Sequence, residues 1–259
     1  MLRCRRCGFE KLWKLSSGKV RCANCRTSFH PRVGGVVVPP ALLRRVVAEF
    51  DLEHSTNVIL ERCAISKYKL LTLLTAIRRT MATDLPAPFS GIVEVDETYV
   101  GGQWKNKRKS ARRWSAKRGR GTSKQPVFGI LCRDRQVWAE IVAGVEARDL
   151  QPRIEQRVRK GAVVCSDGWR GYTGLATKGY VHRLVDHGSG KYSDRRGSHI
   201  NGLEGFWGYL KRKLAQKGGI RRERLPLFLA EYVWRYNHRQ QSHKQRVNVL
   251  LSLIRGVHI

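Results

Sequence analysis

The chain has 259 residues, of which 51 are Lys or Arg and 20 are Asp or Glu, so its formal net charge is +31. Hydrophobic residues make up 41% of it, which is typical of a globular protein and excludes a disordered one. So large a positive excess repels itself in a folded chain, and nucleic acid is the anionic partner that it most often indicates. An anionic membrane fits less well, since no long basic amphipathic helix is evident.

The sequence contains no recognisable targeting or membrane segment. Its first residues, MLRCRRCG, lack an apolar stretch of the length found in signal peptides. No apolar run approaches the roughly 18 residues of a membrane span. We therefore expect a soluble cytoplasmic protein, in which the seven cysteines favour metal binding or free thiols over disulfides.

Residues 1–32 contain two C-x-x-C pairs, Cys4 with Cys7 and Cys22 with Cys25. Each pair turns two thiolates toward one point, and the spacer between the pairs offers two short strands around a Ser-Ser-Gly turn. This layout predicts a zinc ribbon, in which the four cysteines hold a structural Zn²⁺. A segment this small cannot bury an adequate core, so the metal must stabilise its fold. The remaining thiols lack partners at ligand spacing and are expected to be buried apolar groups: Cys63, Cys132 and Cys165.

A linker is expected over 31–40, followed by a helical segment over 41–83. The run Ser55-Thr56-Asn57 is suited to cap one of its helices, and Ser66 is suited to cap another. The second of these helices carries an apolar stripe of Leu70, Leu73, Leu74 and Ile77, together with the basic residues Lys67, Lys69, Arg78 and Arg79. A short helix, a turn and a longer basic helix suggest a helix-turn-helix that contacts DNA. The alternative is a helical spacer between the ribbon and the main domain.

A third region, which we place at 88–259, begins after the boundary segment DLPAPFSG. Three strands are expected first, followed by alternating helices and strands, which indicates a mixed α/β sheet flanked by helices. The expected strands cover 91–101, 127–134, 136–145, 161–167 and a segment near 180–186. The expected helices cover 148–159, a segment that starts near 199, and 222–238.

Two acidic residues, Asp96 and Glu97, interrupt the apolar pattern of the first of these strands. Side chains alternate along a strand, so Asp96 and Glu97 cannot share one face of the sheet. We expect one of them to face a functional site and the other to be solvated or paired with a cation.

Asp167 follows directly on the apolar run of the fourth strand, in VVCSDGWRGY. The carboxyl ends of strands in α/β sheets are where ligands bind, which favours a functional role. An ordinary Asp-Gly turn is the alternative.

The segment HINGLEGFWGYLKRKL predicts a helix whose buried stripe includes Leu203 and Trp207. Glu204 lies beside that stripe. Lys211 follows seven residues later, nearly two turns on, so the carboxylate and the ammonium project from almost the same side. Asn201 shares this side and could reach the same ion.

The segments VEVDETYVGG, SDGWRGY and HINGLEGFWGYLKRKL together resemble the DDE transposases of bacterial insertion sequences, in particular the group that has an N-terminal zinc ribbon. This resemblance covers nearly the whole chain and implies an RNase H-like catalytic domain. It also implies that Asp96, Asp167 and Glu204 are the catalytic acids, with Lys211 as the companion of Glu204. Some relatives use Asn as the third metal ligand, which makes Asn201 the alternative to Glu204.

Phosphoryl transfer in DNA is served by two hard cations held about 4 Å apart by carboxylates, which fits two Mg²⁺ or Mn²⁺ ions here. We therefore expect a DNA transposase that cleaves and joins strands, with double-stranded DNA, both element ends and target, as its partner. Pairing two ends needs a homo-oligomer, and the expected place of action is the nucleoid.

A basic insertion runs from Trp104 to Lys124 inclusive, and ten of its residues are Lys or Arg while none is acidic. Such composition predicts a loop that contacts phosphates, giving affinity that depends on salt without selecting a sequence. The alternative is a solvated arm.

Three other functions remain open from the sequence alone. The chain could be a catalytically inactive DNA-binding protein derived from a transposase, but all three candidate acids are present. A zinc-ribbon transcription or RNA-binding factor would explain the charge but not the arrangement of acids. A structure-specific nuclease of the same fold would cleave without joining strands.

Overall fold

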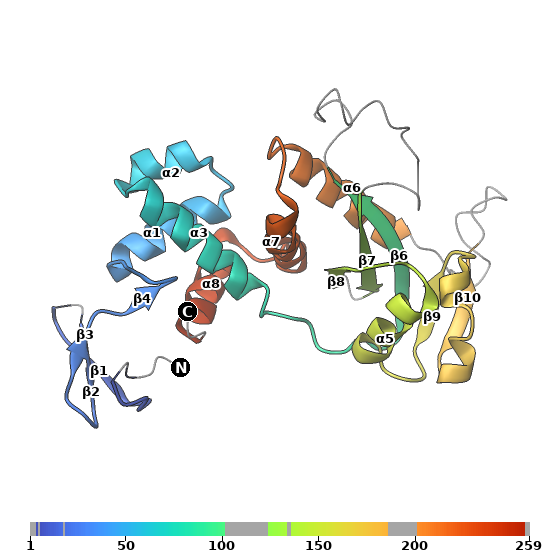
Figure 1. Cartoon of the computed structure of the whole chain (residues 1–259), viewed down its shortest axis with the longest axis horizontal. Coiled ribbons are helices and arrows are strands. Elements are labelled where there is room, and N and C mark those ends of the chain that lie inside the picture. Colours follow the sequence, from blue (N-terminus) through green and yellow to red (C-terminus); the bar gives the residue numbers. More distant parts are fainter. Residues whose placement is uncertain are drawn as a thin grey trace. The chain divides into compact units, whose positions relative to one another are not determined.

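The computed structural model describes residue 4 and residues 6–17, 19–101, 124–133, 136–185 and 201–256 (Figure 1). The chain divides into two compact units, one formed by Met1–Asp84 and His238–Ile259 and the other by Leu85–Asn237. In the described parts, no helix combines the length and the apolar character needed to cross a membrane.

The first unit begins with a small antiparallel sheet of three strands, β1 (Leu12–Lys14), β2 (Val20–Cys22) and β3 (Ser28–Phe29). A two-stranded hairpin follows, formed by β4 (Arg32–Val33) and β5 (Val36–Val37). We expected a linker at this point. The hairpin forms because Gly34 and Gly35 adopt positive φ angles of 57° and 85° in its turn, and its strand β5 contacts helix α3.

Among its described residues, the first unit also contains the helices α1 (Pro40–Asp51), α2 (Thr56–Cys63), α3 (Lys67–Met81) and α8 (His243–Gly256). The hydroxyls of Ser55 and Ser66 cap α2 and α3, accepting hydrogen bonds from Val58 N and Lys69 N. Both caps agree with the expectation, as does the burial of the expected apolar stripe of α3: Leu70, Leu73, Leu74 and Ile77. Helix α8 packs on α1 and α3, although we predicted no helix after residue 238 and placed these residues in the domain over 88–259.

The second unit contains a five-stranded mixed sheet of order β10-β9-β6-β7-β8. Strand β7 runs antiparallel to β6 and β8, whereas β9 runs parallel to β6 and β10. The mixed α/β class is therefore confirmed. The strands are β6 (Ile92–Val100), β7 (Gln125–Cys132), β8 (Val137–Ile141), β9 (Val163–Ser166) and β10 (Val181–Leu184). Two short 3-10 turns, η3 (Arg170–Tyr172) and η4 (Ala176–Lys178), connect β9 to β10.

Each face of the sheet is covered by its own hydrophobic core. On one face, Val93, Val95 and Ile130 pack with α5 (Ala147–Arg157) and with Tyr172 of η3. On the other face, the sheet packs against α6 (Asn201–Ala215) and α7 (Leu225–Asn237), which contribute mainly apolar and aromatic side chains: Leu203, Phe206, Trp207, Leu210, Leu229 and Tyr232. The alternation of β6 is what divides its side chains between these two layers.

Candidate active site

Asp96 and Glu97 point to opposite faces of β6, in agreement with the alternation argument. The Oδ2 atom of Asp96 accepts a hydrogen bond of 2.9 Å from Nε1 of Trp207 in α6. The Oε2 atom of Glu97 accepts a hydrogen bond of 2.8 Å from the hydroxyl of buried Tyr172. Asp96 thus faces the α6 layer, while Glu97 is held by the layer of α5 and η3.

Trp207 reaches Asp96 because the neighbouring strand has no side chain at the place where the indole lies. Gly129 of β7 is the direct cross-strand partner of Asp96. A Cβ atom at position 129 would lie 2.5 Å from Cη2 of Trp207 and 2.6 Å from Cζ2. Only glycine permits this close approach, so Gly129 and Trp207 act together in presenting a donor to the carboxylate.

Glu94 attaches the start of helix α6 to the same face of the sheet. It lies two residues before Asp96, is 1% exposed, and accepts a hydrogen bond of 2.8 Å from the backbone N–H of Leu203. Early backbone N–H groups of a helix have no partner within the helix, and a carboxylate there also interacts favourably with the helix dipole. We did not identify Glu94 from the sequence, although the period of two from Asp96 places it on this face.

Asp167 leaves the sheet beside Asp96. Strand β9 pairs in parallel with β6 up to Glu94 and Cys165, and Asp96 and Asp167 each come two residues after these partners. The Oδ1 atom of Asp167 accepts a hydrogen bond of 3.0 Å from Trp169 N, which orients the carboxylate in a tight turn. The Asp turn that we gave as the alternative is therefore present, at a residue that lies beside Asp96.

The pKa of Asp96 is raised to about 7, first by burial, then by the charge of Glu97 and also by that of Asp167. The indole N–H of Trp207 opposes this rise because it donates to the charged form. Two strands therefore bring the Asp96 and Asp167 carboxylates near enough to repel each other electrostatically. Such crowding is favourable only when a cation or a proton offsets the charge.

The end of β9 is held by a second polar pair that sequence reasoning missed. Ser166, which is fully buried, donates to the carbonyl of Asp167 and lies 2.8 Å from Nε2 of His182 in β10. Since the hydroxyl hydrogen is used in the first contact, Ser166 accepts from the Nε2–H of His182 in the second. Burial lowers the pKa of His182, which favours this neutral ring. The turn that carries Asp167 is thereby attached to the neighbouring strand.

Helix α6 places the predicted residues Asn201, Glu204 and Lys211 along its length. Burial and the charge of Lys124 lower the pKa of Lys211, whereas Asp96 raises it, so the ammonium is coupled electrostatically to the first aspartate. Glu204 and Asn201 are exposed. The carboxylates of Asp96, Asp167 and Glu204 do not form a close group. Among the described residues, four cysteine thiols in the first unit do so.

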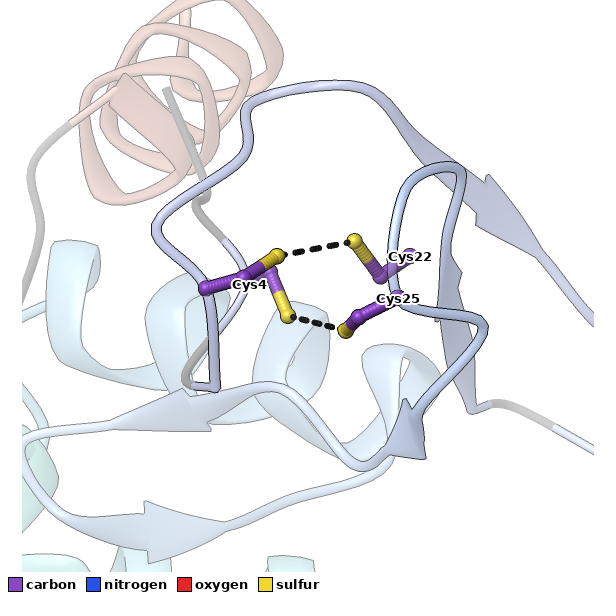
Figure 2. A group of neighbouring side chains, drawn as sticks. Cys4, Cys22 and Cys25 are labelled. Atoms are coloured by element: carbon purple, nitrogen blue, oxygen red, sulfur yellow. Dashed lines mark hydrogen bonds between the residues drawn. The ribbon is translucent and has the colours of Figure 1, made fainter.

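Those four thiols belong to Cys4, Cys7, Cys22 and Cys25, whose sulfur atoms all lie within 4.8 Å of one another. Cys4, Cys22 and Cys25 converge from two turns of the chain (Figure 2). The Sγ atoms are 3.4 Å apart in the pair Cys4–Cys25 and 3.6 Å apart in the pair Cys7–Cys22. Hydrogen bonds with Thr27 lower the pKa of Cys25 to about 6, which favours the thiolate that a metal binds. Four converging thiols match the donor set of structural zinc.

Helices α2 and α3, which we expected to form a helix-turn-helix, are joined by a short turn and contact each other. Ala64 ends α2 in the left-handed conformation, with φ 48° and ψ 46°, and Ser66 then caps α3. Exposed side chains at the start of α3 include Lys67, Lys69 and Tyr68, the last of which is 75% exposed.

The basic insertion expected between Trp104 and Lys124 lies outside the described residues except for Lys124 itself.

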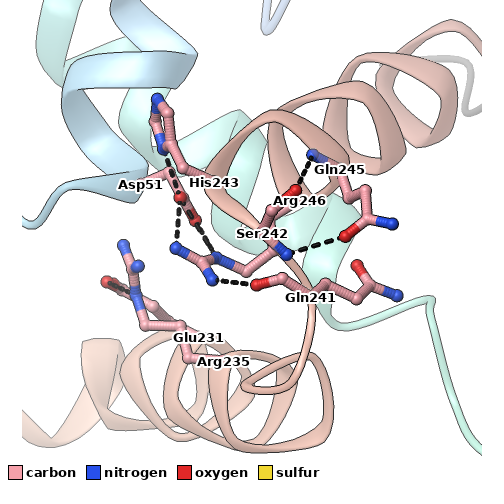
Figure 3. A network of polar contacts seen from close by, with 8 residues as sticks. All are labelled: Asp51, Glu231, Arg235, Gln241, Ser242, His243, Gln245 and Arg246. Carbon is pink, nitrogen blue, oxygen red and sulfur yellow. Dashed lines mark hydrogen bonds and ion pairs between the residues drawn. The ribbon is translucent and has the colours of Figure 1, made fainter.

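A buried ion-pair network attaches the C-terminal helix to α1 (Figure 3). Asp51 of α1, which is 3% exposed, accepts hydrogen bonds from Nδ1 of His243 at 2.8 Å and from Nε and Nη2 of Arg246 at 2.9–3.1 Å. Nη1 of Arg246 donates to the carbonyl of Gln241. We did not predict this network, because its members are 192–195 residues apart in the sequence.

A family model described as the ISXO2-like transposase domain matches residues 88–237. An uncharacterized transposase-like protein of Haemophilus influenzae is 30% identical over 121 residues, covering 47% of this chain and 95% of that protein. An uncharacterized protein in the transposable element ISH50 of Halobacterium salinarum is 26% identical over 267 residues, covering 96% of this chain and 90% of that protein. A pre-cleavage Mos1 transpososome aligns over 90% of this chain and 68% of its own, with 14% identity and a TM-score of 0.33.

Proposed function

The chain belongs to the family of ISXO2-like transposases, and on that premise we propose that it is a DDE transposase that cleaves DNA at the ends of an insertion sequence and joins the ends to target DNA. The observation that carries the proposal is that Asp167, which follows the end of β9, and Asp96, in the middle of the neighbouring parallel strand β6, each lie two residues beyond the last pair of these strands. Charge repulsion from Glu97 and Asp167 helps to raise the pKa of Asp96, as expected for a site that receives cations.

The donor set fits divalent metal ions. Carboxylate oxygens are the ligands that Mg²⁺ and Mn²⁺ prefer, and Asp96 and Asp167 supply them from adjacent strands. Glu204 is the proposed third acid, with Asn201 as the alternative, since both lie in the first turn of α6. When bound, a pair of such ions activates the attacking oxygen and stabilises the leaving oxygen of the phosphodiester.

The protein residues around these ligands have separate roles in the proposal. Trp207 holds the Asp96 carboxylate in one orientation through its N–H. Lys211, whose ammonium is coupled to Asp96, would bind a phosphate of the DNA strand that enters the site. Glu94 fixes the start of α6 against the sheet, so that the residues of α6 are presented toward β6.

DNA recognition would come from the first unit. We assign a structural Zn²⁺ to the four cysteines of the ribbon and contact with the double-stranded element ends to the ribbon and the α2–α3 pair. The strand order and directions of the second unit support an RNase H-like domain. Pairing two element ends requires at least two protomers, so the working form would be a homo-oligomer acting on DNA at the nucleoid.

The direct test is cleavage and strand transfer on duplexes that carry the DNA bordering the gene, with Mg²⁺ or Mn²⁺. Asp96→Asn should bind these duplexes as the unmodified protein does but should neither cleave nor join them. Glu97→Gln is the matched control, because it makes the same chemical change one residue later, on the opposite face of β6. It should retain cleavage, since Gln still accepts from Tyr172.

Full activity of Asp96→Asn would refute the assignment of the site. Binding without any cleavage by the unmodified protein would instead indicate a transposase-derived DNA-binding protein, and cleavage without joining would indicate a nuclease.

A further inference from the structure

The two C-x-x-C turns of the ribbon end with the same backbone geometry but differ in the residue that follows each of them. Gly8 follows Cys7 with φ 73°, and its N–H donates to the carbonyl of Cys4 at 2.8 Å. Arg26 follows Cys25 with φ 59°, and its N–H donates to the carbonyl of Cys22 at 3.2 Å. The two positions are therefore equivalent. Glycine at position 8 adopts this left-handed conformation without strain, whereas arginine at position 26 does not.

A side chain in the left-handed region strains the backbone, so Arg26 disfavours the folded ribbon relative to glycine at the same position. Its guanidinium lies over the indole of Trp13, 5.7 Å from the ring centroid. The stabilisation that an exposed contact of this kind provides does not exceed the strain. Stability of the ribbon therefore does not explain an arginine at position 26, which points to a role in binding.

Arg26 belongs to an exposed surface, the Trp13 face, formed by Trp13, Arg21, Arg26 and Ser28. Trp13 pairs with Arg21 across β1 and β2, and Arg21 pairs with Ser28 across β2 and β3, so these three form one row across the sheet. Trp13 is 42% exposed. Nε of Arg21 donates to the backbone carbonyl of Arg26 at 3.3 Å, so the guanidinium of Arg21 is held close to residue 26.

We propose that the Trp13 face binds the phosphate backbone of duplex DNA. Arg26, supported by the Trp13 ring, donates to a phosphate oxygen, Arg21 contributes a second positive charge, and the hydroxyl of Ser28 is available as a further donor. Planar guanidinium groups match phosphate geometry, and charge complementarity selects this polyanion as the occupant. That the nucleic acid is duplex DNA rests on the proposed function. The Trp13 face identifies where the ribbon contacts that DNA.

The test is Arg26→Gly in the full-length, zinc-loaded protein, because the change removes the strain and the phosphate contact together. Binding to a labelled duplex should weaken about tenfold, as for loss of one charge-assisted hydrogen bond. The slope of log K against log salt should fall by about 0.9, the value for one phosphate contact. Zinc release to a chromogenic chelator should be no faster than from the unmodified protein.

Lys19→Ala is the matched control, since it removes one exposed charge from the ribbon outside the Trp13 face. It should leave the affinity and the salt slope nearly unchanged. Unchanged binding by Arg26→Gly, or faster release of its zinc, would overturn the inference and make Arg26 a structural residue. If the unmodified protein bound no duplex even at low salt, the proposed function itself would fail, and the two failures are thereby distinguished.

Discussion

Gly129→Ala offers a sharp test of the arrangement around Asp96. The added Cβ would lie 2.5 Å and 2.6 Å from two atoms of the Trp207 ring and 3.2 Å from Cδ1 of Leu203. Trp207 is 4% exposed and belongs to a packed aromatic cluster, with the ring of Phe206 5.2 Å away, so the indole cannot swing into solvent. The backbone of β7 or the Trp207 ring must move instead.

Overpacking of a well-packed core costs about 1–3 kcal/mol. Replacing glycine in a strand interior by alanine stabilises it by roughly 0.5–1 kcal/mol, which offsets part of this cost. We therefore expect the free energy of unfolding to fall by about 1–2 kcal/mol. Any shift of the indole also lengthens its 2.9 Å hydrogen bond to Asp96, so DNA cleavage should fall by more than the loss of folded protein explains.

Denaturant unfolding, followed by circular dichroism, measures the stability of the full-length protein, and cleavage is assayed under conditions in which both variants remain folded. Gly205→Ala in α6 is the matched control, because nothing lies within 4 Å of the added Cβ. Alanine in a helix interior is favoured by about 1 kcal/mol, so this control should be slightly more stable than the unmodified protein.

Combining Gly129→Ala with Trp207→Phe should recover most of the stability, because the smaller ring leaves room for the methyl group. Cleavage should remain impaired, since phenylalanine has no N–H to donate to Asp96. A Gly129→Ala protein as stable as the unmodified one would refute the close approach on which this reasoning depends.

Three further predictions concern charge and metal. With a chelator present, the stability gained by Asp96→Asn should grow as the pH rises from about 4 to about 7 and should be constant above that. The reason is that the folded state raises the pKa of Asp96 to about 7 and so disfavours its charged form. A stability gain that shrinks with rising pH would contradict the pKa shift. Cys22→Ser should lower the zinc content measured by atomic absorption and make residues 1–32 sensitive to protease, whereas undiminished zinc would argue against the ribbon. Arg246→Ala leaves the buried carboxylate of Asp51 with fewer partners and should cost about 3–5 kcal/mol in chemical unfolding, while exposed Arg255→Ala in the same helix should change stability by less than about 0.5 kcal/mol.

The sequence by itself determined the features that depend on residues near one another in the chain. Two C-x-x-C pairs predicted the cluster of thiols, and the run 55–57 together with Ser66 predicted two helix caps. The alternation of β6 predicted that Asp96 and Glu97 lie on opposite faces. Each of these follows from local geometry, because turns, caps and strand periodicity depend on only a few consecutive residues.

Only the tertiary structure decided which distant residues meet. Asp96 obtains its donor from Trp207, 111 residues away, and the contact depends on β7 placing Gly129 opposite Asp96. Helix α8 returns to α1 through Asp51, so the second unit ends at Asn237 although we expected a domain that continues to residue 259. No local pattern encodes these pairings, because strand register and helix packing are chosen by the combined burial of all the elements together.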